Sequence, residues 1–211
     1  MCGIILIKSI INKNIRNDLI NGLQQLQNRG YDSVGIGYID QYNMLKCFKY
    51  ASDTTDCFDK LISHRDNYNL FLDMAIGHTR WATHGEKNTL NAHPHMSIDN
   101  KFMIVHNGII ENFQELRNFL NVNGINCISE TDTEVIINLI SYYFNKLKNI
   151  ELSIKRVCNL LEGTYAIGII SSNNPDNIYI VRNGSPLVFG KNKDYLICCS
   201  EISGFNNKIN N

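Results

Sequence analysis

The second residue of the chain carries the clearest chemical signal in the sequence. Cys2 follows the initiator Met1, and aminopeptidases commonly remove a methionine that precedes such a small side chain. The new first residue would then hold a thiol and a free α-amine, with reference pKa values of ~8.5 and ~7.7–8.0. An N-terminal amine that takes the proton of a nucleophile is an established catalytic arrangement. The alternative is a small residue without a chemical role at the start of an apolar strand.

Arg80 and Asp132 could bind the two charged groups of one small molecule. Arg80 follows a predicted strand, where arginine is often a solvated edge residue, but its planar guanidinium can also hold a carboxylate through two parallel hydrogen bonds. Asp132 falls in the first turn of a predicted helix, where an acid favours the helix dipole without any ligand. Taken singly, each residue favours the structural role. Together they would form a receptor for the zwitterionic end of an amino acid.

The dipeptide Asn107-Gly108 also has two interpretations. Asn-Gly is a strong turn signal, and a turn that ends a strand would account for it. A side-chain amide beside an unhindered backbone N–H would equally supply two donors to a developing oxyanion, and removal of one such donor typically costs ~10²–10³ in rate.

Five of the six histidines lie between residues 78 and 106, in a stretch that follows neither the helical nor the strand period. Long irregular segments in compact domains are usually functional or disordered. His93 and His95 could face one way in an extended segment, with His84 or His106 nearby, as in a metal site. Because no cysteine or carboxylate stands at a ligand-like spacing beside them, we expect no metal.

The elements that must position these residues follow from apolar periodicity and from turn and cap signals. Thr131 and Glu134 fit a capping box at the start of a long amphipathic helix, and Asn17 is the expected N-cap of the first helix. We expect helices over 17–27, 53–63, 111–120, 132–147 and 152–161, and strands over 1–7, 34–39, 44–49, 74–77, 102–106, 164–170, 178–182 and 195–199.

Composition limits the class of protein. The 211 residues are 44% hydrophobic, which suffices for one globular domain with a sizeable core. Twenty basic residues balance twenty acidic ones, so neither nucleic acid nor an anionic membrane is expected as a partner. No apolar run approaches the length of a membrane span. Seven cysteines without a Cys-x-x-Cys pair favour reduced thiols and a cytoplasmic location.

Taken together, these residues resemble the class II, or N-terminal-nucleophile, glutamine amidotransferases, in particular their hexosamine-forming branch. The resemblance covers nearly the whole chain. Its landmarks are MCGI at Met1, RGYDS at Arg29, GHTRWATHGE at Gly77, NAHPH at Asn91, VHNGIIEN at Val105, SETDTEV at Ser129, EGTYA at Glu162 and GSPLV at Gly184. The resemblance implies an α+β fold, a four-layer αββα sandwich of the N-terminal-nucleophile hydrolase type.

The resemblance also implies a role for each matching residue. Cys2 would be the nucleophile, and Asn107 with Gly108 the oxyanion hole. Arg80 would hold the α-carboxylate of glutamine and Asp132 its α-ammonium group.

Other residues would complete the substrate site. Thr83 and His84 would help to enclose the substrate, with His93 and His106 also counted among the residues that bind it. Trp81 is similar to the family residue that gates ammonia passage. Arg29 would support the catalytic end of the chain.

The reaction implied is hydrolysis of L-glutamine to glutamate and ammonia through a Cys2 thioester, without a metal or organic cofactor. In the family, the ammonia passes to a sugar-phosphate isomerase part that makes glucosamine 6-phosphate. We expect residues 1–211 to be a single glutaminase domain, short at its C-terminal end and without the isomerase domains. The sequence leaves open whether the chain forms a homo-oligomer.

Three alternatives stay open at this point. One is the glutaminase of an amidophosphoribosyltransferase-type enzyme, which shares the same superfamily. Another is a metal-dependent hydrolase that uses the histidines. The third is an inactive module that binds glutamine as a sensor.

Overall fold

The computed structural model describes residues 2–64, 70–81 and 86–207, and in these ranges the chain forms two antiparallel sheets. The larger sheet has the order β3 (Leu45–Ala51), β2 (Ser33–Ile39), β4 (Met74–Arg80), β1 (Gly3–Ser9), β10 (Tyr195–Cys199) and β9 (Val188–Lys191). The smaller sheet has the order β5 (His95–Met96), β6 (Phe102–Ile110), β7 (Gly163–Ser171) and β8 (Asn174–Asn183).

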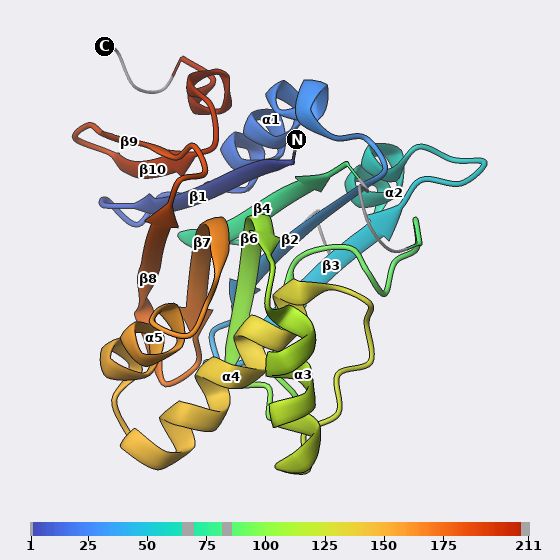
Figure 1. Cartoon of the computed structure of the whole chain (residues 1–211). Helices are drawn as coiled ribbons and strands as arrows, with labels where there is room; N and C mark the ends of the chain where they lie inside the picture. Colours follow the sequence, from blue (N-terminus) through green and yellow to red (C-terminus); the bar gives the residue numbers. More distant parts are fainter. Residues whose placement is uncertain (1, 65–69, 82–85, 208–211) are drawn as a thin grey trace.

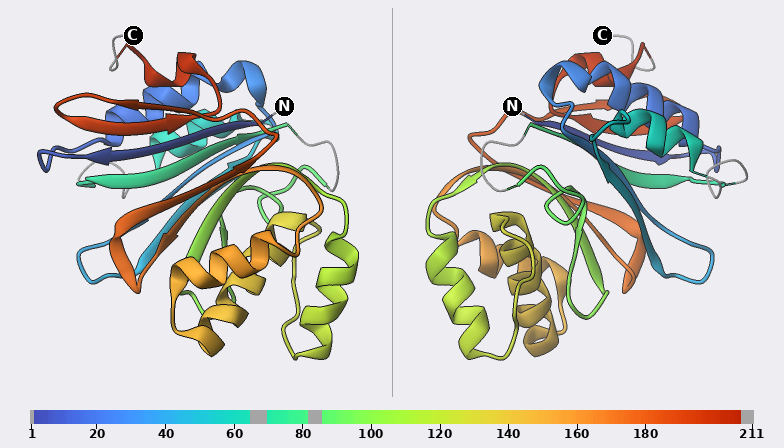
Figure 2. Two further views of the ribbon diagram at one scale, coloured as in Figure 1. Left: turned by 60° about the vertical axis from the view of Figure 1, so that its left-hand side comes forward. Right: turned by 90° about the vertical axis from the view of Figure 1, so that its right-hand side faces the viewer.

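The sheets face each other, and helices cover both outer faces (Figures 1 and 2). The larger sheet carries α1 (Arg16–Gln25) and α2 (Cys57–Ser63), with the short helices η1 (Gln27–Arg29) and η3 (Ile202–Phe205) nearby. The smaller sheet carries α3 (Phe113–Val122), α4 (Asp132–Leu147) and α5 (Ile150–Cys158). The layers therefore run helix, sheet, sheet, helix.

Strand β1 shows why the sequence folds in layers. Side chains of a strand alternate between its two faces. Ile5 and Ile7 point to the outer helices and join one apolar cluster, whereas Ile4 and Leu6 point to the second sheet and join another. Because both faces are covered, residues 3–7 of the strand are apolar without interruption. Leu6 packs over Gly168 of the opposite sheet, where a Cβ would lie 2.3 Å from a Leu6 methyl carbon.

Strand β6 repeats this division in the smaller sheet. Phe102 and Ile104 pack against α4 and its neighbours, and Met103 and Val105 enter the layer between the sheets. The two central strands thus present their apolar faces to each other, and their ends with Cys2 and Asn107 meet at one edge of the sandwich.

Most of the expected elements are present, with three corrections. Helix α1 begins at Arg16, and its N-cap Ile15 makes no side-chain cap hydrogen bond, so the prediction of Asn17 as a cap was wrong. Strand β6 continues to Ile110 instead of ending before Asn107. The short strands β5 and β9 were not expected.

The cap of α4 was correctly predicted at Thr131, whose hydroxyl accepts from Glu134 N–H at 3.3 Å. The Glu134 carboxylate instead accepts the N–H groups of Ile128 and Ser129, at 3.0 and 2.5 Å. Glu134 therefore binds the backbone two and three residues before the cap, where a simple capping box would bind the cap residue itself, and these bonds hold the loop that leads into the site.

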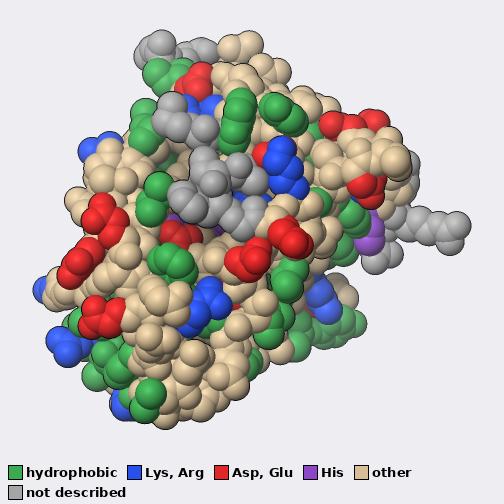
Figure 3. Space-filling model, turned by 45° about the vertical axis from the view of Figure 1, so that its right-hand side comes forward, with side chains coloured by type: hydrophobic (Ala, Val, Ile, Leu, Met, Phe, Trp, Pro, Cys, Tyr) green, Lys and Arg blue, Asp and Glu red, His purple; other side chains and the backbone are tan. Residues whose placement is uncertain are grey.

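Among the described residues, no helix combines the length and the apolar character that a bilayer span requires. On the face shown in Figure 3, acidic and basic side chains lie among one another and form no large patch of one sign. This mixed pattern matches the even balance of charge in the sequence.

Candidate active site

Cys2 lies immediately before β1, where three separate segments hold it. Its backbone carbonyl accepts from Arg29 Nε at 3.0 Å and from Asn107 Nδ2 at 2.8 Å. Its Sγ accepts from the backbone N–H of Trp81 at 3.3 Å. Arg29 in turn forms an ion pair with Glu201 at 3.1 Å. The predicted nucleophile and the predicted supporting arginine are therefore in direct contact.

The Cys2 thiol is not activated by its surroundings alone. Burial raises the pKa of the thiol, and the Trp81 backbone hydrogen bond and the positive charges of Arg80 and Arg29 only partly oppose that effect. Because the thiolate is the nucleophile, a base must remove the proton. The free α-amine of a trimmed Cys2 would be on the same residue and could do this.

Asn107 and Gly108 lie inside β6 and not in a turn, which corrects the structural alternative for this dipeptide. They pair with Ala166 and Tyr165 of β7. Gly108 has φ +131°, a backbone conformation that is unfavourable for every residue except glycine. A Cβ at this position would also lie 2.0 Å from Thr164 O. Only glycine can therefore give β6 this positive φ at the point where the strand lines the cavity.

One cavity of about 160 Å³ joins the predicted residues. It is lined by Cys2, Arg80, Trp81, His93, His106, Gly108, Ile109, Ile110, Phe113, Glu130, Thr131, Asp132 and Thr133. The predicted nucleophile, the predicted carboxylate and ammonium partners and the glycine of the predicted oxyanion hole therefore line the same cavity, although they are widely separated in the sequence.

Arg80 ends β4 and is 5% exposed. Its Nη1 donates to the carbonyl of Glu86 at 3.1 Å. Burial lowers the pKa of the guanidinium, and the negative charges of Asp32, Glu130 and Asp132 act in the opposite direction. Arginine nevertheless stays charged in proteins, so the cavity holds a cation that is only partly solvated.

Asp132 starts α4 and faces the same cavity. Its Oδ2 accepts from the backbone N–H of Ile110 at 2.9 Å, and its Oδ1 accepts from the Thr133 hydroxyl at 3.3 Å. Burial alone would raise the pKa of Asp132, but hydrogen bonds from His106, Ile110 and Thr133 lower it below its ordinary value. An ionised carboxylate therefore lines the same cavity as the Arg80 cation, as a zwitterionic ligand requires.

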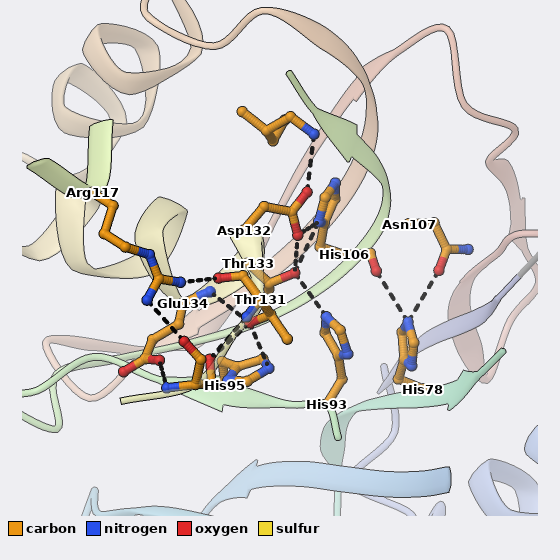
Figure 4. A network of polar contacts seen from close by, with 12 residues as sticks. His78, His93, His95, His106, Asn107, Arg117, Thr131, Asp132, Thr133 and Glu134 are labelled. Atoms are coloured by element: carbon orange, nitrogen blue, oxygen red, sulfur yellow. Dashed lines mark hydrogen bonds and ion pairs between the residues drawn. The ribbon is translucent and has the colours of Figure 1, made fainter. Parts of the chain in front are cut away.

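The predicted substrate-binding histidines line the cavity but direct their polar atoms to the protein (Figure 4). His93 Nε2 and His106 Nδ1 lie 2.8 and 2.9 Å from the Thr133 hydroxyl oxygen. Since a hydroxyl has one donor and two acceptor positions, Thr133 can accept from both rings while it donates to Asp132. These two histidines support the Asp132 carboxylate through Thr133. No sequence pattern had indicated a role for Thr133.

His95 is structural in its contacts. His95 Nε2 lies 3.1 Å from the Thr131 hydroxyl, which caps α4. Burial lowers the pKa of His93 and His95 well below the ordinary value, so both are neutral. Among the described residues, no three or more histidine, cysteine or acidic side chains are grouped as metal ligands.

Trp81 is 44% exposed at the rim of the cavity and makes an edge-to-face contact with Tyr31, at 5.4 Å between ring centroids. Thr83 and His84, the residues expected to enclose the substrate, lie outside the described residues.

A second set of contacts, which no sequence pattern indicated, lies beside Arg80. The Glu130 carboxylate accepts from the Glu86 N–H at 2.9 Å and from Asn91 Nδ2 at 2.8 Å. Asn91 Nδ2 also donates to the Glu86 carbonyl, at 3.2 Å. Lys87 forms an ion pair with Asp32 at 2.7 Å. These contacts fix the backbone that carries the Arg80 partner.

Comparison with known proteins now identifies the family. The model of the glutamine amidotransferase domain matches residues 42–210, which is most of the chain. The chain belongs to the glutamine amidotransferase family. The match begins after Cys2, so the placement of Cys2 in the cavity is an independent observation.

The similar curated proteins are isomerizing glutamine–fructose-6-phosphate aminotransferases. That of Staphylococcus aureus is 39% identical over 201 residues, or 95% of this chain, and that of Clostridium acetobutylicum is 40% identical over 204 residues, or 96% of this chain. In both cases the chain spans only 32% of the relative's length.

Solved structures confirm the expected fold. The chain matches glutamine phosphoribosylpyrophosphate amidotransferase of B. subtilis, complexed with ADP and GMP, with a TM-score of 0.80 and 25% identity over 97% of this chain and 43% of that one. A class-II glutamine aminotransferase domain protein of Silicibacter pomeroyi matches with a TM-score of 0.59 and 11% identity, over 94% of this chain and 88% of that one. The prediction of an α+β sandwich of the N-terminal-nucleophile type was correct.

Proposed function

We propose that residues 1–211 form the glutaminase domain of a glutamine–fructose-6-phosphate aminotransferase. The observation that carries this proposal is the single cavity lined by Cys2, Arg80, Gly108 and Asp132. In it, Arg80 binds the α-carboxylate of L-glutamine and Asp132 binds the α-ammonium group, so the side-chain amide reaches Cys2.

The chemistry is acyl transfer through two tetrahedral intermediates. After Met1 is removed, the Cys2 α-amine takes the thiol proton as the sulfur bonds to the amide carbon. The carbonyl electrons move to the oxygen, where Asn107 Nδ2 and the Gly108 N–H stabilise the charge. The carbon–nitrogen bond then breaks, and the amine's proton leaves with ammonia. Water, deprotonated by the same amine, cleaves the thioester to glutamate and restores the thiol.

Substitution of the nucleophile is the direct test. Cys2→Ala should abolish ammonia release from glutamine and retain the thermal unfolding midpoint, since the thiol contributes little apolar contact. Cys127→Ala, a half-buried cysteine between α3 and α4, is the matched control and should keep full activity. Glutaminase activity that persists in Cys2→Ala would exclude the proposal and favour a histidine-based hydrolase.

The state of the N-terminus belongs to the same experiment. Mass spectrometry of the assayed sample should show that Met1 is absent and that a glutamine-analogue electrophile labels Cys2 alone. Burial raises the pKa of the other thiols, that of Cys47 to about 11 and that of Cys198 to about 12, which disfavours their labelling. A native protein that retains Met1 would instead favour an inactive glutamine sensor.

The acceptor of ammonia is proposed from the relatives. Identity of 39–40% to the fructose-6-phosphate aminotransferases exceeds the 25% to the phosphoribosylpyrophosphate amidotransferase, although the latter shares the fold. A fusion of this chain to the isomerase part of the S. aureus relative should support growth of a strain that requires glucosamine. A fusion that hydrolyses glutamine but fails to form glucosamine 6-phosphate would favour the acceptor of an amidophosphoribosyltransferase-type enzyme.

The sugar-phosphate isomerase part and the cytoplasmic location are included in the proposal. The described cysteines are all free thiols, as in reducing compartments. No metal or organic cofactor enters any step.

A further inference from the structure

His78 lies on β4 beside the predicted oxyanion hole, although neither the motif comparison nor the cavity lining assigns it a role. It is 1% exposed. Its Nε2 is 3.0 Å from the backbone carbonyl oxygen of His106 and 3.1 Å from Oδ1 of Asn107 (Figure 4). The ring therefore faces the two residues of β6 that lead into the cavity.

The His106 carbonyl fixes the tautomer of the His78 ring. A carbonyl oxygen can only accept a hydrogen bond, and a neutral imidazole carries one N–H. The proton must therefore be on Nε2, and Nδ1 must hold a lone pair. Nδ1 is buried and has no hydrogen-bond partner, which suits an unprotonated nitrogen better than a second donor.

The fixed tautomer in turn fixes the Asn107 amide. Because His78 Nε2–H is a donor, the Asn107 atom at 3.1 Å must be the oxygen. The NH₂ group is then directed to Cys2, whose carbonyl it meets at 2.8 Å. A flipped amide would set donor against donor at His78 and acceptor against acceptor at Cys2, so one orientation is strongly favoured.

The His78 ring is also held in place by its other neighbours. It stacks on His93 with 4.1 Å between centroids and 21° between planes. Burial lowers the pKa of His78 to about 3, so the ring stays neutral and keeps the same tautomer throughout the physiological range. A second proton would have to be placed on the buried Nδ1.

We propose that His78 is a positioning residue for the glutaminase reaction, which holds the Asn107 amide with its N–H groups toward the reacting carbonyl. The proposal rests on the proposed function. Without the His78 donor, only the Cys2 carbonyl still favours this orientation. The amide then presents its oxygen to the developing oxyanion more often, and that oxygen repels the charge that the amide should stabilise.

Two variants of similar polarity test the donor. In His78→Gln the amide nitrogen can reach the position of Nε2, whereas in His78→Asn it is too short to do so. In His78→Asn we expect kcat for glutamine to fall, at most by the ~10²–10³-fold that one oxyanion donor supplies. In His78→Gln we expect kcat to stay within a few-fold of wild type. Equal losses in both variants would overturn the proposal.

Two measurements separate positioning from a general structural effect. The affinity for L-glutamate should be unchanged in His78→Asn, because glutamate relies on Arg80 and Asp132. The rate of Cys2 alkylation by iodoacetamide should also be unchanged, because displacement of iodide develops no oxyanion. A parallel loss of kcat, glutamate affinity and alkylation would overturn the proposal, since it would show a damaged site.

A double variant completes the test. If His78 acts only through Asn107, the variant His78→Asn with Asn107→Ala should be no slower than Asn107→Ala alone; additive losses would contradict the mechanism. His95→Gln is the matched control, an equally buried histidine that contacts Thr131, and should keep kcat. Wild-type protein that fails to hydrolyse glutamine would refute the proposed function, whereas a selective failure of these variants would refute only the role of His78.

Discussion

At the scale of single residues, the proposed function depends on Arg80 as the group that binds a carboxylate in the cavity. Its guanidinium is planar and nearly buried at 5% exposure, and the Glu86 carbonyl orients one of its nitrogens. A lysine at this position would keep the charge but could not form two parallel hydrogen bonds to a carboxylate.

We therefore expect Arg80→Lys to raise the KM for glutamine by roughly 10–100-fold, because one hydrogen bond to a charged group contributes about 1.5–3 kcal/mol. kcat should change less. Steady-state kinetics measure both quantities. The control is Arg156→Lys, because the Arg156 guanidinium lies over the ring of Tyr143. An unchanged KM would remove Arg80 from the carboxylate site.

At the scale of elements, Gly108 sets the geometry of β6 at the cavity. Gly108→Ala would place a methyl group 2.0 Å from Thr164 O in a backbone with φ +131°. β6 and β7 would have to separate where their ladder reaches the site, so both stability and kcat should fall.

Gly124→Ala offers a matched control, because Gly124 also has positive φ, +79°, but nothing within 4 Å of its Cβ position. Backbone strain of about 1–3 kcal/mol applies to either site, and the clash applies only to Gly108. Urea unfolding should show the larger loss for Gly108→Ala, and only that variant should lose activity. Equal losses in the two variants would mean that the close approach to Thr164 is relieved at no cost.

The same strand shows how far sequence could predict structure. The proposed roles of Cys2, Arg80 and Asp132 followed from the family resemblance of their motifs, and the structure places all three residues around one cavity. The prediction of a turn at Asn107-Gly108 was wrong, because long-range pairing with β7 overrides a local turn preference. The contact between His78 and Asn107 joins residues on two different sheets, so no local pattern could indicate it.

At the scale of the whole molecule, the layered fold encloses histidines as well as apolar side chains. His78, His93 and His95 are 1%, 6% and 4% exposed. Burial lowers the pKa of each, and the positive charge of Lys49 adds to this effect at His93 and His95. The fold therefore keeps three imidazoles neutral at pH values where the unfolded chain would protonate them.

This enclosure makes folding stability depend on pH with a definite sign. In the unfolded chain each histidine titrates near pH ~6.5, whereas in the folded chain its pKa is lower. The unfolded state therefore binds more protons below that pH, and the free energy of unfolding falls as the pH falls. The stabilisation should be complete above about pH 6.5 and decrease by up to about 1.4 kcal/mol per histidine per pH unit below it.

Urea unfolding between pH 7.5 and 5 measures this effect directly. Lowered carboxylate pKa values, such as that of Asp99 at about 2, affect stability only at lower pH, so the loss in this window reports on the histidines. His95→Gln removes one of the three groups and should reduce the slope by about a third of its value, because each group contributes equally once fully protonated in the unfolded chain. A free energy of unfolding that stays constant from pH 7.5 to 5 would show that the cluster accepts protons while the protein remains folded, and that the neutral tautomer inferred for His78 is not maintained.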